Sequence, residues 1–135
     1  MAISRGFIPY SVEDGHVSAF EYLPADAITP KIGLALTQTG GLLTVASGTT
    51  KPNYICMCEK SGAVSAGDLL PVIRVAADMT FRTTCSEAFT ERKLGDKVTL
   101  ASGGLQVTAT TTSGVATVTG IEGTASGSGV LVRFI

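Results

Sequence analysis

The sequence is poor in charge and has no long apolar run. Charged residues make up 16% of the 135 residues and the net charge is -1, whereas soluble domains carry about 25% charged residues. Proteins that bind nucleic acid usually show a basic stripe, and a membrane-spanning helix needs about 18 consecutive apolar residues. The sequence has neither feature, so we expect no nucleic acid and no membrane among its partners.

Tryptophan is absent and aromatic residues make up only 6% of the chain. Large aromatic side chains supply much of the contact area of ligand-binding surfaces, so their scarcity counts against a lectin. Hydrophobic residues nevertheless make up 44% of the chain. So little charge beside so much apolar surface favours a protein that assembles, because colloidal repulsion between its copies is weak.

Cysteine and histidine are also scarce, which limits metal chemistry. The N-terminus lacks the apolar core of a signal peptide, so we expect a cytoplasmic chain with free thiols. Cys56 and Cys58 form a C-x-C pair, and Cys85 stands alone. Zinc normally takes four ligands, and only His16 or a carboxylate is left to complete a site. Strand alternation places Cys56 and Cys58 on one face as small buried side chains, so we expect no metal and no cofactor.

The single histidine is the only side chain with an ordinary pKa near neutrality. His16 follows Glu13 and Asp14, but no nucleophile is organised around it, and Asp14-Gly15 is typical of a turn. No glycine-rich loop precedes a lysine and a helix, as a phosphate site requires. We therefore expect no catalytic residues and no enzymatic activity.

The pattern of Val, Ile, Thr and Leu, interrupted by Gly, Asn and Pro, is typical of strands and turns. It predicts a mainly β protein: a small β-barrel or β-tulip-like domain of short antiparallel strands. One short helix is expected at 86–93, "SEAFTERK", with Ser86 as its N-cap. The expected strands are 17–23, 34–38, 42–46, 54–59, 69–76, 80–84, 97–101, 105–110, 116–121 and 130–135.

One uncharged phrase occurs twice, as "GGLLTVASGTT" from Gly40 and "GGLQVTATTTS" from Gly103. It belongs to two longer segments, residues 31–75 and 93–134, whose sequences resemble each other; we call this internal similarity the echo. Either the two halves are pseudo-repeats, or β-hairpins rich in Gly, Thr and Val simply look alike. Uncharged strands with free edges aggregate, so we expect barrel closure or neighbouring chains to cover them.

The N-terminal residues 1–16 show no strand period and are expected to form an extended arm before a single β domain at 17–135. Terminal residues are often frayed. Disordered tails seldom carry apolar clusters, however, and this segment contains Phe7, Ile8 and Tyr10 beside Arg5. We therefore expect the arm to dock on a partner or on the domain.

Several phrases resemble one protein family. "EYLPADAITPKIGLALTQTGGLLTVASGTTKPNYICM" resembles the opening of tailed-bacteriophage head decoration proteins, also called capsid-cement proteins. "AGDLLPVIRV", "LGDKVTLASGGLQVTATT" and "VLVRFI" resemble their closing half, so the resemblance covers most of 20–135. It implies a non-enzymatic homotrimer on the outer capsid surface of the virion, made in the host cytoplasm, that stabilises the head by bridging capsomers. The implied partner is the major capsid protein, and the implied contact residues are Arg5, Phe7, Ile8 and Tyr10.

Two other functions remain open from the sequence. One is a head-fibre or surface-adhesion module that binds a host ligand. The other is a small metal-binding or enzymatic β protein that uses His16, Cys56, Cys58 or Cys85. Neither choice is decided by a motif in the chain.

Overall fold

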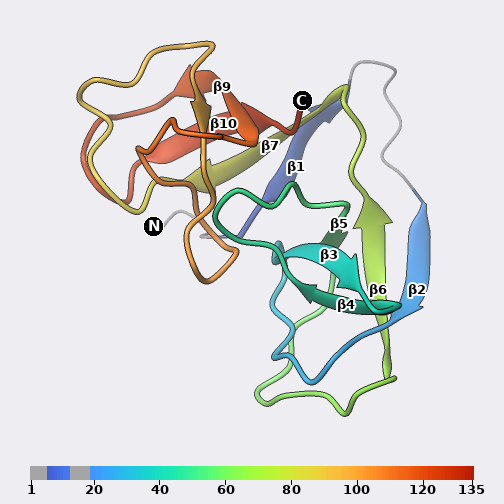
Figure 1. Cartoon of the computed structure of the whole chain (residues 1–135). Helices are drawn as coiled ribbons and strands as arrows, with labels where there is room; N and C mark the ends of the chain where they lie inside the picture. The colour runs from blue at the N-terminus through green and yellow to red at the C-terminus, as the bar shows by residue number, and fades with distance from the viewer. Residues whose placement is uncertain (1–5, 13–18) are drawn as a thin grey trace.

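The computed structural model describes residues 6–12 and 19–135 and shows an all-β protein. Within these residues there are ten strands in two five-stranded antiparallel sheets and no helix, which confirms the prediction of a mainly β fold. The strands form two sheets rather than the single barrel expected from the sequence. Figure 1 shows these sheets as two halves of an elongated molecule.

Each sheet combines strands that lie far apart in the sequence. Sheet A contains, in spatial order, β1 (Ile8–Val12), β7 (Met79–Thr84), β10 (Gly129–Arg133), β9 (Ala116–Ile121) and β8 (Lys97–Val98). Sheet B contains β2 (Phe20–Pro24), β6 (Leu69–Arg74), β5 (Tyr54–Cys56), β3 (Ala35–Thr39) and β4 (Leu42–Val45). β1 and β2 are therefore edge strands of different sheets.

Two clusters of buried side chains form the core. The first cluster joins the inner face of sheet A to one face of sheet B and includes Phe7, Ala35, Ile55, Ile73, Met79, Phe81, Val118, Val130, Val132 and Phe134. The second cluster contains Ala25, Leu34, Leu36, Leu43, Tyr54, Cys56, Val64, Leu70 and Val72. Successive side chains of a strand point to opposite faces, so Val72 and Ile73 of β6 enter different clusters.

Residues 6–12 of the expected N-terminal arm pack on the domain, one of the two places where the arm was expected to dock, but they include a strand that the sequence did not predict. Residues 8–12 form β1, which pairs antiparallel with β7. The Phe7 side chain is fully buried in the first cluster, and its amide donates to the Gly33 carbonyl at 2.8 Å. This strand has no recognisable two-residue period in the sequence, because Pro9 and a bulge interrupt the alternation.

The helix expected at 86–93 is absent. The Ser86 and Phe89 amides donate to the carbonyls of Val107 and Thr124 instead of to a helical turn, and the Phe89 side chain is fully buried. The Glu87 carboxylate accepts a bond from the Ala109 amide at 3.0 Å. Helices this short are marginal on their own, so these long-range contacts determine the backbone.

The two glycine phrases have different environments. Gly40 and Gly41, with φ of 60° and 82°, form the exposed two-residue turn between β3 and β4, as expected of a hairpin with positive φ at both positions. Gly104 is buried, and a Cβ there would lie 2.7 Å from Cγ1 of Val45. The strand expected at 105–110 is replaced by an irregular segment in which Val107 makes isolated bridges to Cys85 and Leu100.

Four turns with glycine at their third position recur along the echo. In each turn the glycine has a positive φ, and the amide of the fourth residue donates a hydrogen bond to the carbonyl of the first residue, as in type II turns. They span 31–34, 65–68, 93–96 and 125–128. The segments 31–75 and 93–134 thus begin with the same turn, although their strands lie in different sheets.

Candidate functional site

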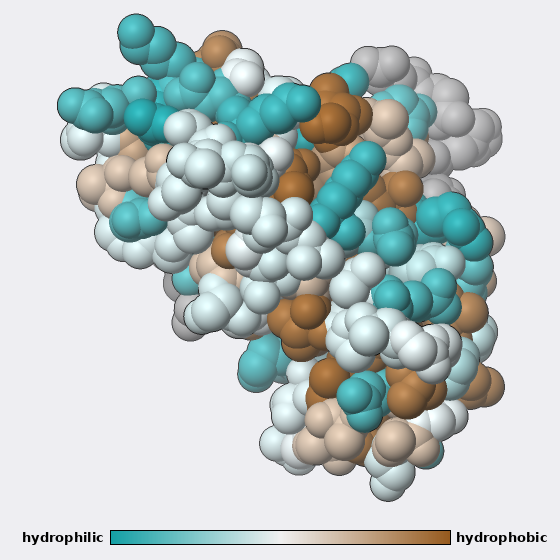
Figure 2. Space-filling model, in the orientation of Figure 1, coloured by the Kyte–Doolittle hydropathy of each residue, from teal (hydrophilic) through white to brown (hydrophobic). Residues whose placement is uncertain are grey.

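An exposed apolar surface lies on β2 and β6, at the edge of sheet B. Phe20, Tyr22 and Leu69 are 53%, 64% and 60% exposed, and the half-buried Pro24 and Pro71 lie beside them. We call these five residues the β2–β6 apolar face. In the space-filling view, hydrophobic atoms also reach the surface over the part of the molecule that sheet B forms (Figure 2). Large exposed apolar groups in one place are typical of interaction sites.

Strand pairing explains why these side chains gather. Tyr22 lies opposite Pro71 and Pro24 lies opposite Leu69, and directly paired residues share a face of the sheet. Phe20 pairs in turn with Ile73, which is fully buried in the first cluster. The apolar face is therefore a continuation of the core surface of sheet B beyond the point where sheet A covers it.

An ion pair lies across the same two strands on the opposite face. Arg74 donates from Nε and Nη2 to the Glu21 carboxylate at 3.1 and 3.0 Å, and its guanidinium lies 5.3 Å from the centre of the Tyr54 ring. The bonds to Glu21 raise the pKa of Arg74. This bidentate contact adds to the backbone pairing of β2 with β6, so the apolar face has a defined backbone beneath it.

A second surface feature is a hollow of about 190 Å³ on sheet A, lined by Ile8, Pro9, Tyr10 and Arg82. The pairing of β1 with β7 shifts register between Pro9 and Ser11, so Tyr10 is the additional residue of a bulge. A bulge redirects the side chain that it carries, and Tyr10 is 60% exposed. The N-terminal strand thus contributes three walls of this hollow.

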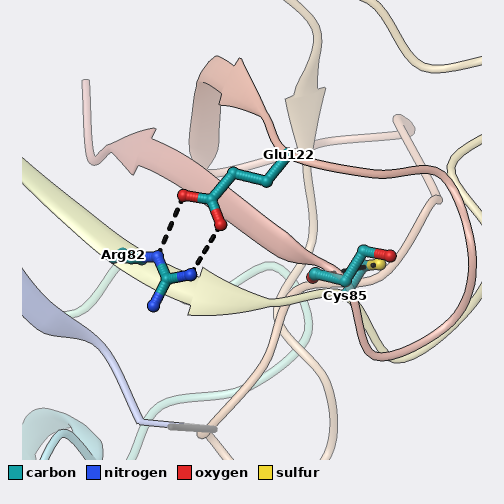
Figure 3. Close-up of polar contacts among 4 residues, drawn as sticks. Arg82, Cys85 and Glu122 are labelled. Atoms are coloured by element: carbon teal, nitrogen blue, oxygen red, sulfur yellow. Dashed lines mark hydrogen bonds and ion pairs between the residues drawn. The ribbon is translucent and has the colours of Figure 1, made fainter. Parts of the chain in front are cut away.

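The fourth wall is held by an ion pair. Arg82 on β7 donates to the Glu122 carboxylate from Nε at 2.9 Å and from Nη2 at 2.6 Å (Figure 3). These bonds lower the pKa of Glu122. Gly129 leaves room for the pair, because a Cβ there would overlap Oε1 of Glu122. The hollow is consequently apolar on three sides and electrically neutral on the fourth.

The contact residues predicted from the sequence fall into three situations. Arg5 lies outside the described residues. Phe7 is fully buried, so its side chain stabilises the fold and has no surface to offer a partner. Ile8 and Tyr10 line the hollow. Sequence reasoning missed the β2–β6 apolar face, although its signal was present: "LL" at 69–70 is apolar on both faces of one strand.

The residues considered for metal or acid–base chemistry are spread through the chain. Cys56 and Cys58 have their Sγ atoms 3.9 Å apart, whereas Cys85 lies in the first cluster and donates to the Ala125 and Ser128 carbonyls. His16 belongs to the segment 13–18, outside the described residues. Across residues 6–12 and 19–135, no group of three or more His, Cys, Asp or Glu side chains could hold a metal ion.

The Cys56 thiol predicts a loss of stability at alkaline pH. Burial raises its pKa from the ordinary 9.0 to about 11. The contribution of this thiol to the free energy of unfolding is fully present below pH 9 and is lost as the pH rises towards 11. The reason is that residue 56 ionises at a lower pH in the unfolded chain than in the folded protein. Urea titrations under reducing conditions measure the free energy of unfolding at each pH. Between about pH 8 and pH 10.5 it should fall by about 2 kcal/mol more in the wild type than in Cys56→Ala. Parallel losses in the two proteins would contradict this assignment.

No helix in the described part of the chain could span a bilayer. Comparison with protein-family models and with curated proteins finds no match to this chain.

Proposed function

We propose that this chain is a non-enzymatic phage capsid decoration protein, which binds the outer surface of the assembled head and bridges capsomers. The observation that supports it most directly is the β2–β6 apolar face, with three large side chains more than half exposed. The resemblance of most of residues 20–135 to capsid-cement proteins indicates which partner would cover such a face: the major capsid protein.

The energetics of the apolar face suit a contact that is repeated over a shell. Fully burying one large apolar side chain contributes about 1.5–3 kcal/mol. The remaining exposed area of Phe20, Tyr22 and Leu69 therefore corresponds to a few kcal/mol per copy. Simultaneous engagement of several linked sites multiplies such modest affinities. A homotrimer, the oligomer proposed here, presents three faces at once, and its mass is measured directly by light scattering.

The hollow on sheet A is the second proposed contact region. Ile8 and Tyr10, two of the four residues predicted from the sequence, line it. β1 is an edge strand with a proline and a bulge, features that prevent indiscriminate strand pairing. We therefore propose contact through side chains at this site, with the ordered segment 6–12 held on the domain.

The proposal predicts that polar substitutions on the apolar face weaken capsid binding. A Tyr22→Thr/Leu69→Thr double variant keeps strand-favouring residues but removes the exposed apolar groups. Its affinity for expanded empty heads of the encoding virus should fall roughly 30- to 100-fold, equivalent to about 2–3 kcal/mol. Co-sedimentation over a range of protein concentrations measures the change.

Leu94→Thr is the matched control, because Leu94 is 65% exposed but lies in the turn at 93–96, away from β2 and β6. It should bind like the wild type. Absence of wild-type binding would refute the proposed function. Equal binding by the double variant would refute only the role of the apolar face, and Tyr10→Thr would then test the hollow. Deleting 1–16 is unsuitable, since it removes β1 and Phe7.

A further inference from the structure

Two thiols lie close together at the end of β5. The Sγ atoms of Cys56 and Cys58 are 3.9 Å apart, and Sγ of Cys56 also donates to the Cys58 carbonyl at 3.4 Å. A disulfide has an S–S length of about 2 Å, so side-chain rotation has to close a gap of roughly 2 Å. The fold therefore brings this C-x-C pair near to bonding distance.

The backbone around the pair is fixed on both sides. The Cys56 amide donates to the Leu34 carbonyl at 2.9 Å, and the Cys56 carbonyl accepts from the Gly33 amide at 2.8 Å. The next residue, Met57, donates its amide to the Pro71 carbonyl at 2.9 Å. These bonds hold the segment between β3 and β6, so the two sulfur atoms do not depend on a flexible loop to meet.

The two thiols differ in access. Cys56 is fully buried in the second cluster, whereas Cys58 is half-buried at the margin of that cluster. A reagent from solvent therefore reaches Cys58 first. Burial also raises the pKa of Cys56 to about 11, which keeps it protonated and unreactive towards outside reagents.

We propose that Cys56 and Cys58 form a redox-modifiable dithiol that closes to an intramolecular disulfide by exchange with a small disulfide such as oxidised glutathione. The Cys58 thiolate attacks one sulfur of the small disulfide, whose S–S bond breaks and releases one small thiol. The Cys56 thiol then loses its proton to water, and its sulfur attacks Sγ of Cys58 in the mixed disulfide. The second small thiol leaves. The two protein thiols are oxidised by two electrons while the small disulfide is reduced to two thiols.

Glutathione redox buffers test this proposal on the full-length protein. After alkylation and trypsin digestion, Cys56 and Cys58 fall in peptide 32–60, because the Lys51–Pro52 bond resists cleavage, and Cys85 falls in peptide 83–92. The expected product is peptide 32–60 lighter by two hydrogen atoms. The effective concentration of the two thiols for forming the Cys56–Cys58 disulfide should be at least tenfold higher in the folded protein than in urea, because the fold holds the sulfur atoms close together.

Three variants separate the roles of the thiols. Cys85→Ser should close like the wild type, Cys56→Ser should accumulate a mixed disulfide at Cys58, and Cys58→Ser should leave Cys56 unmodified. Closure that is no more favourable in the folded protein than in urea would overturn the proposal. A stable mixed disulfide on wild-type Cys58, or first reaction at Cys85, would overturn it as well. The comparison of folded and unfolded wild type decides the question even where a serine variant fails to fold.

Discussion

Replacing Phe7 by alanine is expected to lower the free energy of unfolding by about 3–5 kcal/mol, the range for large-to-small changes at buried phenylalanines. The Phe7 ring is fully buried and meets Phe134 edge-on, with ring centroids 5.3 Å apart. Phe134 in turn lies 5.4 Å from Phe81 on β7. Because domains are stable by only about 5–15 kcal/mol in total, losing this ring removes a large part of the stability.

Urea unfolding measures this loss, and Tyr10→Ala, on the adjoining strand β1, is the matched control. Tyr10 is 60% exposed, so its replacement should change the free energy of unfolding by about 0.5 kcal/mol or less. A cost below about 1 kcal/mol for Phe7→Ala would contradict the placement of residue 7 in the core. It would return the N-terminal segment to the role of a docking arm.

Replacing Gly33 by alanine is the second large expected effect, because two backbones touch at this point. Gly33 has φ of 88°, and a Cβ there would lie 2.6 Å from Cα of Gly6 and from the Phe7 amide nitrogen. Backbone atoms cannot yield as a flexible side chain can. We expect a loss of roughly 2–5 kcal/mol, from the left-handed conformation, about 1–2 kcal/mol, and from overpacking, about 1–3 kcal/mol.

Gly95→Ala isolates the steric part of this effect. Gly95 has φ of 94° in an equivalent turn, but nothing lies within 4 Å of its added Cβ. Gly95→Ala should lower the free energy of unfolding only by the cost of the left-handed conformation, about 1–2 kcal/mol. Thermal or urea unfolding of both variants gives the difference. Equal losses would show that the contact between Gly6 and Gly33 is not close enough to constrain the fold.

The sequence allowed most of the strands to be predicted. Val, Ile and Thr in short runs placed β3, β4, β6, β7, β9 and β10 within a few residues of their observed bounds. The Gly40-Gly41 pair also predicted its hairpin correctly. These signals are local, since strand propensity and turn conformation depend on neighbouring residues. The echo between the halves likewise reproduced a turn, at 31–34 and at 93–96.

The candidate surfaces could not be predicted in the same way. "FEYLP" and "LLPVIR" carry large apolar residues in both phases of the strand period, so alternation alone does not determine which phase faces solvent. That choice depends on where sheet A stops covering sheet B. For Ile8 and Tyr10 the sequence identified apolar residues of interest, but the hollow that they line depends on a bulge against the distant strand β7.

By itself, the sequence determined a charge-poor, β-rich chain with turns at defined glycines, because composition is read directly and strands and turns follow from local backbone preferences. Only the tertiary structure decided that Phe7 belongs to the core, that 86–93 is not helical and that two sheets form instead of one barrel. It also decided that Phe20, Tyr22 and Leu69 remain exposed and that two thiols lie 3.9 Å apart. Each of these outcomes depends on contacts between residues far apart in the chain, whose packing outweighs weak local preferences.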